Sequence, residues 1–201
     1  MRRTGPKTRL ARRLGEALRD KDLKYLTKRS YPPGMHGQAR RRRSEYATQL
    51  LAKQKAKWMY LVNERQFGRY VERSSKKRGV TGDALLQYLE LRLDNVVYRL
   101  GFSSSRAQSR QIVSHGFVAV NGKAVNIPSY QVSVGDEVAL AEGKKTTKYA
   151  EALTPRLREH KPQDWLSLSP KDMKGKVLTF PTAQNTGSTL QMDLIIEHYS
   201  R

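Results

Sequence analysis

Charge and apolar side chains are distributed very unevenly along this chain of 201 residues. The first 45 residues carry 15 basic and 4 acidic side chains but only five Leu, Ile, Val or Phe. Between residues 81 and 140, 20 of the 60 residues belong to these four types. A highly charged segment with few apolar residues cannot bury enough apolar surface to fold by itself. We therefore expect an apolar-rich folded unit preceded by a basic arm.

The basic excess also limits the class of partner. The net charge is +21, and residues 1–45 account for +11 of it. Such a charge density repels itself unless a polyanion neutralises it, which favours a nucleic-acid ligand. A solvated tail and an anionic membrane surface are the alternatives, but the arm lacks the apolar face that surface binding requires. No apolar run approaches the roughly 18 residues of a membrane span, and no secretory signal is expected.

Apolar residues at helical spacing predict several helices. Ser44 is suited to the N-cap of a long helix, and Ser105 with Gln108 matches a capping box. Gly116 is suited to the position just after a helix. The segment Tyr31–Gln38 contains two prolines and two glycines, which exclude regular structure there. The predicted helices span about 10–18, 45–72, 82–93 and 95–100, and a further helix follows Ser105.

The strand signals come later in the chain. Asn121-Gly122 between two apolar runs predicts a β-hairpin with a type I′ turn. Val132 and Val134, with Val138 and Leu140, predict a second strand pair. Residues 177–180 are predicted as a strand, 141–176 as loop-like around a buried Trp165, and 190–199 as either strand or helix. Helices followed by hairpins favour the α+β class over βαβ units.

Several segments resemble one family. The run RLDNVVYRLGFSSSRAQSRQIVSHGFVAVNGKAVNIPSY, residues 92–130, is similar to the small RNA-binding module named after ribosomal protein S-four of the small subunit. The rest of the chain resembles the whole ribosomal protein, on the segments 31–38 (YPPGMHGQ), 64–67, 79–86 and 194–201. Only residues 141–190 are loosely similar.

The resemblance implies a fold in three parts. It implies an α+β protein in which the RNA-binding module, a helix pair packed on antiparallel strands, is inserted into a helical domain. An extended basic N-terminal arm precedes both. We expect the arm at 1–44, the helical domain at 45–91 completed by 181–201, and the module at 92–180.

The resemblance also implies a function. Members of this family bind small-subunit ribosomal RNA (rRNA) early in assembly. They lie beside ribosomal protein S-five, near the entry channel for messenger RNA, and they influence decoding accuracy. The expected function is therefore that of a structural constituent of the small ribosomal subunit. It would be a primary rRNA-binding protein that nucleates the subunit body, and not an enzyme. Expected partners are small-subunit rRNA, ribosomal protein S-five, other small-subunit proteins, and messenger RNA near its entry channel on the subunit. We expect no membrane contact and no homo-oligomer, and a location in cytoplasmic or organellar ribosomes.

One departure from the family concerns metal. Many relatives hold a zinc ion with four cysteines in the arm. This chain has no cysteine, and His36 is the one histidine within residues 1–45. A four-ligand site cannot be built from these residues. We expect no metal site and no cofactor, and an arm packed by Leu10, Leu14 and Leu18 together with RNA.

Candidate RNA contacts are cations, amides, hydroxyls and aromatic rings, because RNA is recognised through phosphates, sugar hydroxyls and shape. Cations at i, i+4 along the expected long helix would track phosphates, and three serines precede a helix N-terminus that suits a phosphate. The expected RNA-binding residues are Arg2, Arg3, Arg12, Arg13, Tyr31, Pro33, His36, Arg40, Arg41, Arg42 and Arg43 in the arm, Lys53, Lys57, Arg65, Arg69 and Arg73 in the long helix, and Arg92, Arg99, Ser103, Ser104, Ser105, Arg106, Gln108, Arg110, Gln111, Asn121, Lys123, Asn126 and Tyr130 in the module.

Some of these residues have an equally simple structural explanation. The helical cations match an ordinary solvated face, Ser105 matches a helix cap, and Asn121 matches a turn former. Tyr130 either stacks on a base or packs under the sheet.

Two other protein classes carry the same module. RNA-modifying enzymes such as pseudouridine synthases append a catalytic domain, whereas only about 20 residues follow the module here. Ribosome-rescue and heat-shock RNA-binding factors are shorter and lack both the 31–38 segment and the long helix. No nucleophile elbow, P-loop or metalloprotease spacing is present. A structural ribosomal protein is therefore the leading hypothesis.

Overall fold

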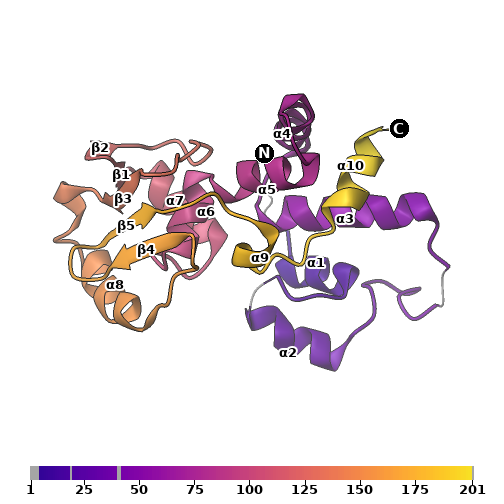
Figure 1. Ribbon diagram of the computed structural model, residues 1–201. Coiled ribbons are helices and arrows are strands. Elements are labelled where there is room, and N and C mark those ends of the chain that lie inside the picture. Colours follow the sequence, from indigo (N-terminus) through magenta and orange to yellow (C-terminus); the bar gives the residue numbers. More distant parts are fainter. Residues whose placement is uncertain (1–4, 19, 40–41, 201) are drawn as a thin grey trace. The chain divides into compact units, whose positions relative to one another are not determined.

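The computed structural model describes residues 5–18, 20–39 and 42–200. Its helices and strands follow the order labelled in Figure 1. They are α1 (Lys7–Leu14), α2 (Asp20–Lys28), α3 (Glu45–Met59), α4 (Glu64–Lys76), α5 (Thr81–Glu90), α6 (Leu93–Arg99), α7 (Arg106–Ser114), β1 (Val118–Val120), β2 (Lys123–Ala124), β3 (Glu137–Leu140), the 3-10 helix η1 (Glu142–Lys144), α8 (Lys148–Glu159), β4 (Leu166–Ser169), β5 (Lys174–Val177), α9 (Ala183–Thr186) and α10 (Met192–Ser200). The predicted α+β class is confirmed.

The chain divides into two compact units. The first contains residues up to 71 together with those from 190 onward, and the second contains residues 72–189. These limits differ from the sequence-based boundaries at 44/45, 91/92 and 180/181. Compactness does not define a functional domain, so that three-part division stays a prediction.

The second unit is built on one antiparallel sheet with the strand order β2-β1-β3-β5-β4. Asn121 and Gly122 both have positive φ, 49° and 79°, which confirms the type I′ turn between β1 and β2. The second predicted strand pair is half confirmed: Val138 and Leu140 lie in β3, but Val132 and Val134 form no strand. The Val132 N–H donates to the Leu91 carbonyl at 2.8 Å, which ties this segment to the residues before α6. β3 pairs with β1 and β5 instead.

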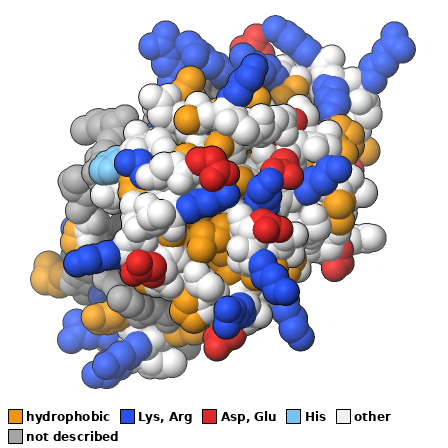
Figure 2. Space-filling view, turned by 90° about the vertical axis from the view of Figure 1, so that its left-hand side faces the viewer, with side chains coloured by type: hydrophobic (Ala, Val, Ile, Leu, Met, Phe, Trp, Pro, Cys, Tyr) orange, Lys and Arg blue, Asp and Glu red, His pale blue; other side chains and the backbone are white. Residues whose placement is uncertain are grey.

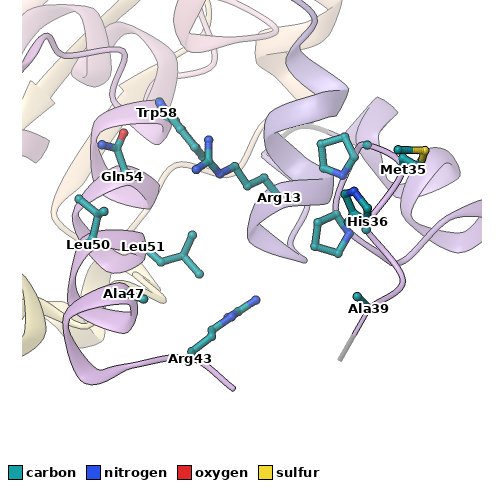
Figure 3. A pocket seen from close by; sticks show the side chains of 14 residues that line it. Arg13, Met35, His36, Ala39, Arg43, Ala47, Leu50, Leu51, Gln54 and Trp58 are labelled. Atoms are coloured by element: carbon teal, nitrogen blue, oxygen red, sulfur yellow. The ribbon is translucent and has the colours of Figure 1, made fainter. Parts of the chain in front are cut away.

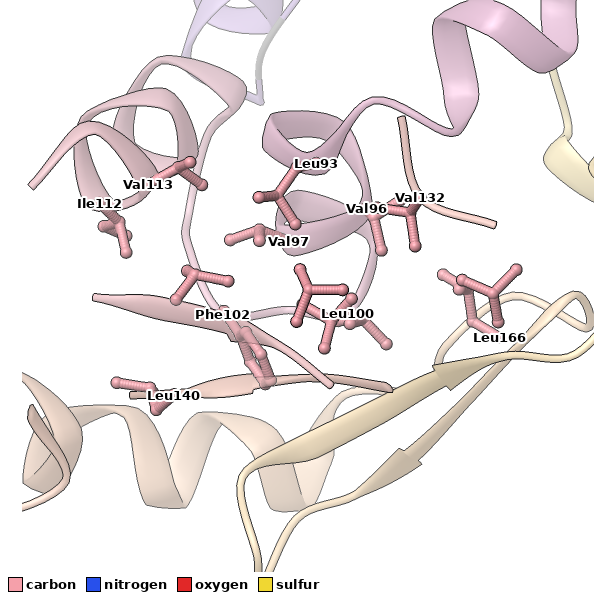
Figure 4. Packing of buried hydrophobic residues seen from close by; sticks show 14 of the residues in the cluster. Leu93, Val96, Val97, Leu100, Phe102, Ile112, Val113, Val132, Leu140 and Leu166 are labelled. Carbon is pink, nitrogen blue, oxygen red and sulfur yellow. The ribbon is translucent and has the colours of Figure 1, made fainter. Parts of the chain in front are cut away.

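The core of the second unit lies where α6 and α7 face this sheet. Leu93, Val97 and Leu100 of this cluster have no exposed surface, and Figure 4 shows them beside the strands. Trp165 is also fully buried, as predicted. The segment 141–176, predicted as loop-like, instead forms η1, α8, β4 and most of β5. It is polar on average, but its few large apolar residues fall on the buried side, among them Leu157.

The single helix predicted over 45–72 is wrong. α3 ends at Met59, Leu61 adopts a positive φ of 55°, and α4 begins at Glu64. The Asn63 side chain accepts a hydrogen bond from the Gln66 N–H at 2.8 Å and so caps α4. The lysines and arginines of this region therefore lie on two helices and do not form one continuous ridge.

Other element ends follow local capping. The helix predicted over 10–18 begins at Lys7 and ends at Leu14, because Gly15 adopts a left-handed conformation and donates to the Ala11 carbonyl. α2 was not predicted. Ser44 and Ser105 cap α3 and α7 as predicted, but the Gln108 side chain bonds the Ser104 N–H, so the capping box is half-formed.

The ends of the remaining elements differ in detail from the predictions. The strand predicted at 177–180 ends at Val177. Residues 190–199, ambiguous in the sequence, lie mostly in helix α10.

Candidate nucleic-acid interface

A groove of about 850 Å³ lies in the first unit, between α3 and the loop that follows α2. Its apolar walls include Leu50, Leu51 and Trp58 of α3 and Pro32 and Pro33 of the loop. Figure 3 shows the side chains of Arg13 and Arg43 extending into the space between these walls. No acidic residue is among the described residues that line it. The groove brings together four of the predicted RNA-binding residues, namely Arg13, Pro33, His36 and Arg43.

The loop that follows α2 is held in shape by a residue of α1. Arg12 donates from Nε to the Tyr31 carbonyl at 3.1 Å, and its guanidinium lies 5.0 Å from the centroid of the Tyr31 ring. Gly37 is required because a Cβ there would lie 2.0 Å from the Pro32 carbonyl oxygen. Arg12 and Tyr31 therefore hold the loop that lines the groove, whereas Arg42, the chain neighbour of Arg43, is exposed. The predicted contacts Arg2, Arg3, Arg40 and Arg41 lie outside the described residues.

Two predicted RNA-binding lysines form ion pairs with one carboxylate of the first unit. Lys53 Nζ lies 3.2 Å from Glu64 Oε1, and Lys57 forms an ion pair with the other oxygen of Glu64. Tyr199 of α10 donates its hydroxyl to Glu64 at 2.7 Å. Burial alone would raise the pKa of Glu64, but the hydrogen bonds from Lys57, Tyr199 and Lys53 outweigh it and lower the pKa from 4.5 to about 2. The predicted cations of α4, Arg65, Arg69 and Arg73, are exposed at successive turns.

This cluster predicts a pH-dependent stability. Because the pKa of Glu64 falls from 4.5 to about 2 on folding, its contribution is present above pH 4.5 and is lost as the pH falls towards 2. Glu64 is half exposed, so we expect only about 1 kcal/mol from it. Urea unfolding of the RNA-free chain should show wild type losing more stability than Glu64→Gln between these pH values. Parallel curves for the two proteins would contradict this account.

On the second unit, most of the predicted contacts surround α7. Ser104, Arg110 and Gln111 are exposed, while Ser105, Arg106 and Gln108 are half-buried. Lys123, Asn126 and Tyr130 are exposed beyond the hairpin turn. Asn121 is held by the fold, because its side chain donates to Asp136 at 2.8 Å and accepts from the Glu137 N–H at 2.9 Å. It shapes the turn.

Three other predicted contacts point into the protein. Arg92 has no exposed surface and binds both oxygens of Asp94, with Nε at 3.0 Å and Nη2 at 2.6 Å. Arg99 pairs in the same two-pronged way with the buried Glu90. Ser103 is buried, and its hydroxyl shares a hydrogen bond with Ser109. In this conformation their polar groups are bonded within the unit, and Arg92 and Ser103 have no exposed surface.

The arginines of α7 are supported from beneath by α6. Arg106 donates from Nε to Asn95 Oδ1 at 2.8 Å, and Arg110 Nη1 lies 3.5 Å from Asp94 Oδ2. Burial raises the pKa of Asp94 even though Arg92 and Arg110 both lower it. Sequence reasoning missed these acceptors and Glu90. The available signal was a set of polar residues inside the apolar run LELRLDNVV.

On the face that Figure 2 shows, the charges do not gather in a single patch. Figure 2 shows Lys and Arg side chains spread over one face with Asp and Glu between them. Within the described part of the chain, no group of three or more His, Asp or Glu is arranged to hold a metal ion. None of the described helices is both long and apolar enough to cross a membrane. Scattered cations, amides and hydroxyls on an α+β scaffold define a candidate nucleic-acid-binding protein.

Comparison with known proteins identifies the family. Residues 2–90 match the family described as "Ribosomal protein S4/S9 N-terminal domain", and residues 91–138 match the "S4 domain". The chain is 50% identical to "Small ribosomal subunit protein uS4" of Dictyoglomus turgidum over 100% of this chain and 99% of the relative. It is 49% identical to uS4A of Symbiobacterium thermophilum at the same coverage, and 46% identical to uS4 of Chloroflexus aurantiacus over 98% of both chains. The chain belongs to the uS4 family of ribosomal proteins.

Proposed function

We propose that this chain is a structural protein of the small ribosomal subunit and a primary rRNA-binding protein that nucleates assembly of the subunit body. The observation that carries the proposal is the identity of 46–50% to small-subunit proteins along essentially the whole chain. The match includes residues 2–90, which lie outside the S4 domain itself. A structural role rather than a catalytic one follows from the family.

The surfaces proposed to bind rRNA are those that remain accessible. They are the groove with Arg13 and Arg43, the exposed cations of α4, and the α7 face with Arg106 and Arg110. The same proposal includes ribosomal protein S-five and messenger RNA as partners. It also includes a role in decoding accuracy and a location in cytoplasmic or organellar ribosomes. They rest on family membership.

A salt-resolved binding titration tests the proposal. The full chain is titrated with small-subunit rRNA fragments at several salt concentrations, with large-subunit rRNA as competitor. We expect tight binding to one small-subunit fragment that survives the competitor at physiological salt. Equal and steeply salt-dependent binding to both RNAs would mean that net charge alone explains the affinity.

The groove can be tested by reversing its two cations. Arg13→Glu with Arg43→Glu should remove two phosphate contacts and reduce the slope of log affinity against log salt by roughly 1.4–1.8, at 0.7–0.9 per contact. The matched control is Lys161→Glu with Lys171→Glu, which changes the net charge equally at two exposed positions outside the predicted set. If both double variants bind alike, the groove is not part of the interface.

A further inference from the structure

Two arginines of α7 are each held by a residue in the first turn of α6. Arg106 donates from Nε to Asn95, and Arg110 lies beside Asp94. The guanidinium of Arg106 is also 4.6 Å from the centroid of the Tyr98 ring. A long cationic side chain at a surface normally samples many rotamers. Arg106 is instead held at two points, by a hydrogen bond on one edge and an aromatic ring on one face.

The amide of Asn95 has one orientation that satisfies its surroundings. Its Nδ2 donates to the Glu90 carboxylate at 2.6 Å and to the Glu90 backbone carbonyl at 2.9 Å. Both of these groups only accept hydrogen bonds. The amide must therefore turn its oxygen away from Glu90, and that oxygen meets Arg106. Glu90 thus determines the orientation of Asn95, and Asn95 determines the position of Arg106.

Glu90 is itself buried and paired. Its side chain is fully buried, and Arg99 binds both carboxylate oxygens, at 2.6 Å and 3.1 Å. Buried charged and polar groups contribute less to stability than well-packed apolar residues of the same volume. Stability is therefore a weak explanation for a buried carboxylate and amide placed directly beneath a half-exposed arginine.

We propose that Asn95, oriented by Glu90, is a positioning residue that holds the Arg106 guanidinium in place for an RNA phosphate. The inference rests on the proposed function, since it needs RNA at the α7 face. A guanidinium offers a rigid fork of donors that matches a phosphate. An arginine already held in place loses less rotamer freedom on binding, which is worth roughly two- to tenfold in affinity.

A double-mutant cycle on rRNA affinity tests this coupling. The full chain is prepared as Asn95→Ala, Arg106→Ala and the double variant, and each is titrated with a small-subunit rRNA transcript. Asn95→Ala alone should weaken binding roughly two- to tenfold. In the Arg106→Ala background it should have no further effect. Arg106→Lys keeps the charge but lacks Nε, so it should be equally insensitive to Asn95→Ala.

Arg110→Ala provides the matched control. Arg110 lies one turn further along α7 and is held by Asp94, not by Asn95. In this background Asn95→Ala should keep its full effect on affinity. Urea unfolding of every variant shows whether each is folded at the temperature of the titration. A merely structural role for Asn95 would weaken binding equally in all backgrounds.

The outcomes separate the two claims. If Arg106→Ala binds rRNA like wild type, the α7 face is not an RNA interface and the positioning role falls with it. If Arg106→Ala weakens binding but Asn95→Ala weakens it further by the same factor as in wild type, the interface stands and the positioning role is wrong. Loss of the Asn95 effect in the Arg106 backgrounds alone is the result that supports the proposal.

Discussion

Replacing Trp165 by alanine is expected to lower the free energy of unfolding of the second unit by about 3–5 kcal/mol. The side chain has no exposed surface and belongs to the apolar cluster between helices and sheet. Its indole N–H also donates to Gln163 at 3.0 Å, and Gln163 in turn donates to the Thr186 carbonyl. Alanine leaves a large cavity and an unpaired acceptor.

The measurement is urea unfolding followed by circular dichroism, because the substitution removes a fluorophore. Trp165→Phe serves as the control, since it keeps most of the apolar volume and loses the indole donor. We expect it to fall between wild type and Trp165→Ala. An alanine variant as stable as wild type would mean that Trp165 is not a core residue.

Replacing Arg92 by alanine should be similarly destabilising, by about 3–5 kcal/mol, because it leaves the Asp94 carboxylate buried and without its main partner. The double variant Arg92→Met, Asp94→Leu removes both charges and should recover most of that loss. Urea unfolding of the three proteins provides the comparison.

The same variants decide whether Arg92 contacts RNA. A phosphate ligand would lower the slope of log affinity against log salt by roughly 0.7–0.9 when removed. We expect the folded fraction of Arg92→Ala to bind rRNA with an unchanged slope. A reduced slope would show that Arg92 leaves its buried position in the complex.

Local signals in the sequence predicted much of the fold. The type I′ turn at Asn121-Gly122 and the caps at Ser44 and Ser105 depend on neighbouring residues alone, and the structure confirms them. The predictions failed where distant residues decide. Val132 was assigned to a hairpin, but its N–H is satisfied by Leu91, 41 positions earlier. The segment 141–176 was predicted as loop-like because it is polar on average, but its few large apolar residues, such as Leu157 and Trp165, pack into the core of the second unit.

For the candidate interface, the sequence determined the ligand class and the pool of candidate residues. Net charge, the spacing of cations and the segments shared with the uS4 family are properties of composition and order, so they need no coordinates. The tertiary structure decided which of those cations are accessible. Arg92 and Arg99 are neutralised by Asp94 and Glu90, whereas Arg13 and Arg43 extend into a groove. The reason is physical: an ion pair depends on the distance between two side chains, and that distance is set by the packing of whole elements.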